Sequence, residues 1–311
     1  MTVLNEPDQW VRDLLWVIRS PSLIGPAPPK TPNEAAKTDM LPSAPDGSLA
    51  NAFGADGASF NFHQIDHDQL AAYFADQVPR RVGFYFERLV QFWLTHIRGV
   101  EMVASSLQVR EGQRTLGEID FLFRDELGRL THWEVAVKFY LHVPHTKIAG
   151  SHFVGPHLKD TFQRKRDRIF DHQLPLGRSH FPEIEIQQTI VKGRIFYALD
   201  HPPVQQLPPA MSPGHLRERW LRRADLAAIE RQSDSRYQIL TKPYWLSDAN
   251  VHETNPSAID GRQLNDQISQ RFSSSDHPVL VSRLSAESDR WIEAERWFVV
   301  PDDWPNVVNA S

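Results

Sequence analysis

The stretch Glu118–Leu141 constrains the fold of this chain more than any other, because two runs within it alternate apolar and polar residues. Alternation with a period of two predicts β-strands whose apolar side chains share one face. The apolar positions are Ile119, Phe121 and Phe123 in the first run, and Trp133, Val135, Val137, Phe139 and Leu141 in the second. We therefore expect two strands joined by a turn at Gly128, with this face against the core.

The opposite face of the same two strands collects ionisable side chains. They are Glu118, Asp120, His132, Glu134 and Lys138. Holding such a set on one small sheet is costly unless the groups share a metal ion or stay in water. The pattern favours a chemical role. The structural alternative is an ordinary half-exposed sheet on which Glu134 and Lys138 form a surface ion pair worth at most ~1 kcal/mol.

The register of the two strands suggests what the chemistry could be. A turn centred near Leu127 would place Asp120 opposite Glu134, with Cβ atoms ~5 Å apart. Two carboxylates at that distance repel each other unless a hard cation lies between them, and Mg²⁺ is often held by one or two carboxylates plus waters and a substrate phosphate. Lys138, on the same face, could stabilise charge on a phosphoryl oxygen or orient an attacking water.

The composition sets the broad class of protein. A chain of 311 residues with 41% hydrophobic residues can form one large domain, or a domain with a smaller appendage. Its net charge of −5 means that any phosphate binding must come from a local basic patch. The absence of cysteine excludes disulfides, thiolate nucleophiles and cysteine zinc sites. Without a signal-peptide pattern or an apolar run of ~20 residues, we expect a cytoplasmic protein that has no membrane partner. The oligomeric state stays open.

The order of predicted elements indicates an α/β fold. A short helix spans Trp10–Ile18, an irregular segment follows over Gly25–Gly57, and then come a largely apolar helix at Arg81–Ile97, a strand at Val100–Glu111, the two strands above, a helix at Leu158–His172 and a strand at Ile190–Leu199. A helix between two strands implies a parallel pair within an otherwise antiparallel sheet. We divide the chain into an N-terminal helix (1–24), a Pro/Ala-rich segment (25–60), an αβββαβ core (61–200) and a C-terminal α+β elaboration (201–311).

Three further features bear on function. Glu87 stands inside the apolar helix, where it needs either an exposed seam or a partner. The densest basic segment carries Lys159, Arg164, Lys165, Arg166 and Arg168. It could be a solvated helix face or a nucleic-acid contact. Histidines at 142, 145, 152 and 157 match no closed zinc site, so we interpret them as loop residues, one of which could assist proton transfer.

The C-terminal third shows no constellation of catalytic residues. We expect a helix over Leu216–Gln232, a further helix at Gln263–Phe272, and strands at Pro278–Leu284 and Trp291–Val300 that pack on the sheet.

The helix–three strands–helix–strand order resembles the PD-(D/E)XK, or restriction-endonuclease-like, superfamily. More narrowly, several motifs resemble a bacterial domain-of-unknown-function family placed in that superfamily. These motifs are Gly117-Glu-Ile-Asp120-Phe, Trp133-Glu-Val-Ala-Val-Lys138-Phe-Tyr-Leu141, Gly155-Pro156, His172-Gln-Leu174 and Lys192-Gly-Arg-Ile-Phe-Tyr197. The resemblance implies that Asp120 and Glu134 are metal ligands, Lys138 the catalytic lysine and Glu87 an acidic residue from the first core helix. It also implies substrate contacts from the basic helix.

The sequence departs from the superfamily at one position. Three residues rather than one separate Glu134 from Lys138, and Ala136 stands where the acid is expected. The two side chains then lie ~13 Å apart along the strand at ~3.3 Å per residue. Either they lean together, or Glu118 replaces the acid, or catalysis has been lost.

These observations predict a Mg²⁺- or Mn²⁺-dependent nuclease that hydrolyses DNA or RNA, with DNA the favoured partner. The alternative is a catalytically degenerate protein of the same fold that binds nucleic acid or another protein through the same face.

Overall fold

The computed structural model describes residues 6–25, 63, 65–75, 78–201, 204, 206–229 and 235–306. The irregular segment predicted from Gly25 onwards lies, apart from Gly25 itself, outside these residues. The predicted N-terminal helix is confirmed as α1, Glu6–Arg19.

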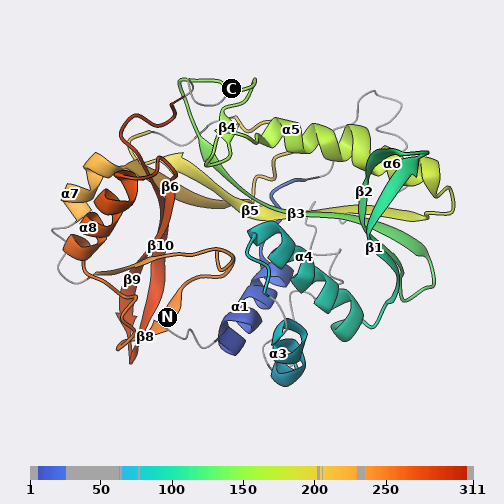
Figure 1. The fold of residues 1–311 in the computed structure, drawn as a ribbon, viewed down its shortest axis with the longest axis horizontal. Helices are drawn as coiled ribbons and strands as arrows, with labels where there is room; N and C mark the ends of the chain where they lie inside the picture. Colours follow the sequence, from blue (N-terminus) through green and yellow to red (C-terminus); the bar gives the residue numbers. More distant parts are fainter. Residues whose placement is uncertain are drawn as a thin grey trace.

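One mixed sheet runs through the whole molecule (Figure 1). Its strand order is β1-β2-β3-β5-β6-β10-β9-β7, with β4 paired to β3 and β8 paired to β10. The strands are β1 Glu101–Glu111, β2 Arg114–Arg124, β3 Leu130–His142, β4 Phe153–Val154, β5 Ile186–Ala198, β6 Leu216–Arg222, β7 Arg236–Ile239, β8 Asn250–His252, β9 Val279–Glu287 and β10 Arg290–Val300. The pairs β3–β5, β5–β6 and β6–β10 are parallel, and the other pairs are antiparallel. The predicted α/β class with a mixed sheet is confirmed.

Helices cover both faces of the sheet around β3 (Figure 1). One face carries α1, α3 (His67–Ala75) and α4 (Val82–Phe92), which continues into a π-helical turn, η3 (Trp93–Ile97). The opposite face carries α5 (Phe162–Asp167), a π-helical turn η4 (Arg168–Gln173) and α6 (Leu174–His180). Short segments η5 (Arg223–Asp225) and α7 (Leu226–Ile229) lie with α8 (Gly261–Phe272) at the other end of the sheet. None of the helices in the described ranges is both long and apolar enough to cross a membrane.

The apolar face predicted for the hairpin packs in the largest core cluster, against α1 and α4. Phe123 and Trp133 meet edge to face with ring centres 5.2 Å apart. Ile119 is the exception, because it is fully buried but packs with Leu122 and Leu176 on the side of α6. The pairing of β2 with β3 ends at Phe121, so β2 is free to twist away with β1 before it reaches Ile119.

The helix predicted to begin at Leu158 begins later, at Phe162. Leu158 has a φ of 60° in a turn whose amide donates to Gly155 O at 2.9 Å. Thr161 then caps α5, because its hydroxyl accepts the Arg164 amide at 3.2 Å.

The helix predicted over Leu216–Gln232 is wrong. As far as Ile229 this segment forms strand β6, followed by the short helical segments η5 and α7, and residues 230–232 lie outside the described ranges. Trp220 explains the difference: it is buried where β6 lies between β5 and β10, and its indole N–H donates to His142 O at 2.9 Å. A tertiary position inside the sheet overrides the local helical preference. The predicted helix at α8 and strands at β9 and β10 are confirmed.

Candidate acidic site at the β2–β3 junction

The candidate site forms where β2 and β3 separate. The described pairing ends at Phe121 opposite Trp133, and the same register extended by one residue places Asp120 opposite Glu134. The Val135 amide donates to Asp120 Oδ2 at 2.8 Å, and the Asp120 amide donates to the Glu134 carboxylate. Each carboxylate thus accepts an amide from the opposite strand, just past the end of the ladder.

Glu134 is fully buried and is held by side chains from three elements. His132 Nε2 lies 2.8 Å from Glu134 Oε1, and Gln173 Nε2 donates to Oε2. Gln187 Nε2 lies 3.0 Å from His132 Nδ1. Burial lowers the pKa of His132 to about 4, so the neutral ring can donate through Nε2 and accept at Nδ1. This network orients the Glu134 carboxylate.

A glycine in α6 allows this network to form. A Cβ atom at Gly177 would lie 2.4 Å from His132 Nδ1. The close approach of α6 to β3 therefore depends on the missing side chain at Gly177. Gln173 was noted from the sequence only within the motif His172-Gln-Leu174, with no role assigned to it. Gln187 was not found, since an isolated glutamine carries no spacing signal.

Three carboxyl groups at the junction have strongly raised pKa values. Burial, together with the charge of Glu134, raises the pKa of Asp120 to about 7. Burial also raises the pKa of Glu134 to about 7. In α4, burial and the neighbouring charges of Asp120 and Glu118 raise the pKa of Glu87 to about 7. The carboxyl groups of Glu87, Asp120 and Glu134 therefore act on one another.

Lys165 of α5 is the lysine that faces these carboxyl groups. The half-buried Lys165 Nζ lies 3.4 Å from Oε1 of Gln173, whose amide holds Glu134. Burial and the charge of Lys138 lower the pKa of Lys165, while Asp120 and Glu134 oppose that shift. Lys165 was predicted only as one of several nucleic-acid contacts. Its period on the helix gave no sign that it faces inward.

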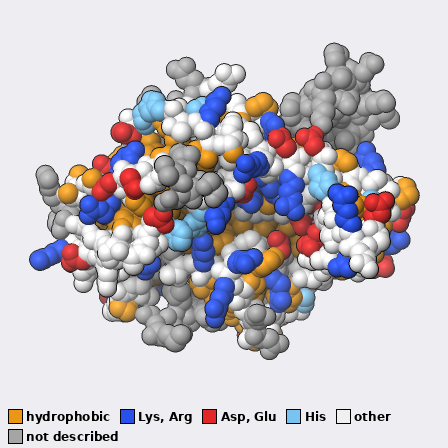
Figure 2. Space-filling model, turned by 45° about the horizontal axis from the view of Figure 1, so that its top comes forward, with side chains coloured by type: hydrophobic (Ala, Val, Ile, Leu, Met, Phe, Trp, Pro, Cys, Tyr) orange, Lys and Arg blue, Asp and Glu red, His pale blue; other side chains and the backbone are white. Residues whose placement is uncertain are grey.

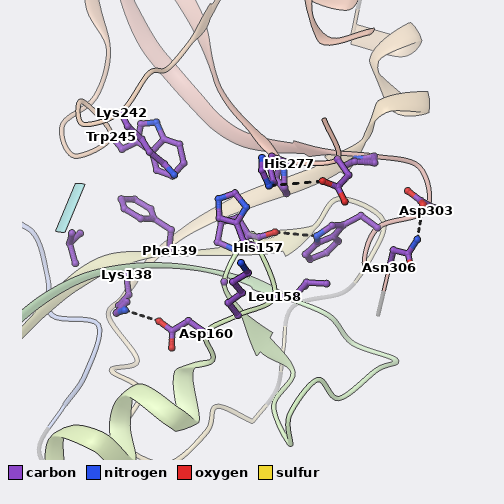
Figure 3. Close-up of a pocket in the computed structure, with 18 residues that line it drawn as sticks. Lys138, Phe139, His157, Leu158, Asp160, Lys242, Trp245, His277, Asp303 and Asn306 are labelled. Atoms are coloured by element: carbon purple, nitrogen blue, oxygen red, sulfur yellow. Dashed lines mark hydrogen bonds and ion pairs between the residues drawn. The ribbon is translucent and has the colours of Figure 1, made fainter. Parts of the chain in front are cut away.

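Lys138 forms its ion pair with Asp160, at 2.7 Å between Nζ and Oδ2 (Figure 3). The surface ion pair between Glu134 and Lys138 that the structural alternative required is not formed. Lys138 instead lines a separate cavity of about 770 Å³, together with His157 and Lys242.

The other predicted site residues are spread around the junction. Glu118 pairs with Gln108 of β1 and acts on Glu87 and Asp120 through its charge. The remaining residues of the basic segment differ in their surroundings. Lys159 lines the cavity beside Lys138, and Arg166 pairs with Asp167. Arg164 and Arg168 are exposed, and the charge of Arg168 acts on Glu134. Figure 2 shows Lys and Arg side chains gathered over the middle of the face that carries α5.

No three His, Asp or Glu side chains in the described ranges lie close enough together to hold a metal ion by themselves. The donor chemistry nevertheless suits a hard cation bound by fewer protein ligands. No described residue donates a hydrogen bond to Asp120 Oδ1 or to Glu87. Glu134 accepts hydrogen bonds from His132, Gln173 and the Asp120 amide, and its carboxyl group also shares a hydrogen bond with the Asp120 side chain.

The fold and the site together define an α/β protein with a buried acidic centre at the edge where two strands of a mixed sheet separate. A family model described as a domain of unknown function (DUF1853) matches residues 12–300, and the chain belongs to that family. The match covers the acidic centre and all the strands of the sheet. No curated protein and no solved structure matches the chain.

Proposed function

We propose that this protein is a divalent-metal-dependent nuclease that hydrolyses phosphodiester bonds at the Asp120–Glu134 centre. The observation that carries the proposal is the convergence of three carboxyl groups with raised pKa values and one inward-facing lysine at a strand junction. Perturbed groups of both signs gathered at one place are typical of catalytic sites. This convergence also supports the PD-(D/E)XK relationship that the sequence motifs suggest.

Asp120 and Glu134 would hold the cation, with Glu87 as a third acidic group. Asp120 Oδ1 accepts no hydrogen bond from the described residues, and a cation would replace the hydrogen bond that joins the carboxyl groups of Asp120 and Glu134. A bound Mg²⁺ or Mn²⁺ would lower the pKa of a coordinated water and polarise the phosphate. The water oxygen would bond to phosphorus and give up one proton, the bond from phosphorus to the leaving oxygen would break, and the leaving oxygen would take up a proton.

Lys165 would supply the positive charge that balances the phosphate at this centre. It is the lysine whose charge acts on both Asp120 and Glu134, whereas Lys138 is paired with Asp160. A fixed ammonium group stabilises negative charge that develops on phosphoryl oxygens. The proposal therefore moves the role expected of Lys138 to a residue of α5.

The test is cleavage of DNA and RNA by the purified full chain in Mg²⁺ or Mn²⁺. Asp120→Asn keeps the size of the side chain and removes the charge, so it should abolish metal-dependent cleavage. Asp289→Asn, at an exposed carboxyl group far along the sheet, should cleave like the wild type. Cleavage that survives in Asp120→Asn would contradict the proposal.

The second candidate is a non-catalytic protein that binds nucleic acid through the same centre. It is favoured by the complete burial of Glu134, and by the fact that no three-residue metal cluster is preformed in the described ranges. Metal-independent binding of nucleic acid, with no cleavage under any metal, would support this candidate.

A further inference from the structure

A groove of about 810 Å³ lies between α4 and the β1–β2 hairpin, next to the acidic centre. Its wall is formed by Arg80, Arg81, Phe84 and Arg88 on one side, and by Ser106 on the other. Glu87 also lines the groove. One acidic group therefore belongs to both the groove and the acidic centre.

Phe84 presents an unusual surface in this groove. Its side chain is 53% exposed, and it is the only aromatic residue among the large exposed apolar side chains of the described ranges. The guanidinium group of Arg81 lies 5.7 Å from the centre of its ring. An exposed aromatic face beside a cation matches a ligand that carries both a flat ring and a negative charge.

The arginines at the mouth of the groove are available to an anion. Arg80 and Arg81 are exposed and form no ion pair with any described residue. Arg88, deeper in the wall, is held in place, because Nη2 donates to Tyr73 O at 3.0 Å and its guanidinium group lies 4.3 Å from the Tyr73 ring centre. Arginine binds phosphate through several donors in a fixed geometry.

The groove is lined by neighbours of Asp120 in β1 and β2. Ser106 lies opposite Asp120 in the β1–β2 register, and its φ of 49° interrupts the regular strand at that point. Phe121, the residue after Asp120, also lines the groove. A ligand in the groove would therefore run directly to the junction of β2 and β3.

We infer that this groove binds single-stranded nucleic acid, with an unpaired base stacked on Phe84 and its phosphates on Arg80 and Arg81. In a duplex the bases are stacked on one another, so only an unpaired base can lie on a protein ring. The inference rests on the proposed function for the location of the acidic centre. It adds that the nucleic-acid strand that reaches Asp120 is unpaired.

The test is fluorescence anisotropy with the full chain in EDTA, where no cleavage can occur. The probes are a labelled oligothymidine strand and its blunt duplex with oligoadenosine. We expect the single strand to bind at least about tenfold more tightly than the duplex, and Phe84→Ala to weaken that binding by about tenfold. Leu127→Ala, which removes another exposed apolar side chain, should bind the single strand like the wild type.

Equal affinity for the strand and the duplex would overturn the inference, as would equal losses from Phe84→Ala and Leu127→Ala. Both residues are exposed, so neither variant should affect folding. Because binding is measured without metal, a Phe84→Ala variant that binds like the wild type would contradict the groove without bearing on catalysis. If the protein binds the single strand through Phe84 but never cleaves it, the inference about the groove stands and only the proposed nuclease activity is contradicted.

Discussion

At the level of single residues, the proposed acidic centre depends on the positions of Glu134 and Lys165. Glu134 is locked by His132 and Gln173, so its carboxylate cannot turn away from Asp120. Gln173 also contacts Lys165, and one amide side chain therefore connects the lysine to the carboxylate. Such a network fixes the relative positions of charged groups before a substrate binds.

Lys165→Ala should lower the single-turnover cleavage rate by about 10²–10³-fold, which is the usual cost of losing one group that stabilises transition-state charge. Lys138→Ala should change the rate only a few-fold, because it removes a half-exposed pair with Asp160. Arg262→Ala, at an exposed arginine of α8 at the other end of the sheet, is the control. A large loss in Lys138→Ala alone would return the catalytic role to that residue.

The raised pKa of Asp120 predicts a pH-dependent stability. Between its ordinary value of 3.8 and its folded value of about 7, the native state holds a proton that the unfolded state has released. The contribution of Asp120 to stability therefore falls as pH rises through this window. Thermal melts should show Asp120→Asn gaining stability relative to the wild type between about pH 4 and about pH 7.

A control and a metal arm complete this pH experiment. Asp289→Asn, which makes the same change at a side chain that is 68% exposed, is the control. Mg²⁺ above about pH 7 should raise the melting temperature of the wild type and not that of Asp120→Asn. A difference between wild type and Asp120→Asn that does not vary with pH would contradict the buried, protonated state of Asp120.

At the scale of elements, the hairpin was predictable because its alternation decides both faces, with Ile119 as the exception, and its turn decides the register. The positions of the side chains that surround Glu134 were not predictable. Lys165, Gln173 and Gln187 reach the centre only through the packing of α5, η4 and α6 on β3, and no local period records that packing. The segment at Leu216–Gln232 failed for a similar reason, because Trp220 is placed in the sheet by partners distant in sequence.

Gly193 tests the parallel pairing of β3 with β5. It lies opposite Lys138 with a φ of 147°, and a Cβ atom there would lie 1.8 Å from Lys138 O. Gly193→Ala should lower the free energy of unfolding by about 3 kcal/mol or more, measured by denaturant titration. Gly83→Ala, in α4 with no atom near its added Cβ, should stay neutral or gain up to about 1 kcal/mol. Similar effects at both glycines would refute the close approach.

At the scale of the whole molecule, the C-terminal third continues the sheet that carries the acidic centre. Strands β6, β10, β9 and β7 extend it beyond β5. The N-terminal helix is tied to both parts: buried Asp13 accepts hydrogen bonds from Tyr85 Oη at 2.8 Å and from the Ser247 amide at 2.9 Å. The elements around the centre are thus held by residues from both ends of the described chain.

Arg296 holds the segment that contains Ser247 against β10. It is 1% exposed, pairs with Glu293, and donates to Trp245 O and Ser247 O at 2.6 Å each. Arg296→Ala should cost about 3–5 kcal/mol in unfolding free energy, because it leaves a buried carboxylate unpaired. Arg283→Ala, which breaks a partly exposed pair on β9, should cost at most about 1 kcal/mol. Equal costs would show that the buried network does not hold β10 in place.

A crystal structure of the protein grown with Mn²⁺ above about pH 7, where Asp120 and Glu134 are ionised, tests most directly whether a divalent cation binds at the junction of β2 and β3. The account predicts an anomalous-difference peak in contact with Asp120 Oδ1 at the junction of β2 and β3, and its loss in Asp120→Asn. A well-ordered junction with no peak at Asp120, under conditions where Mn²⁺ is in excess, would contradict the metal-dependent centre.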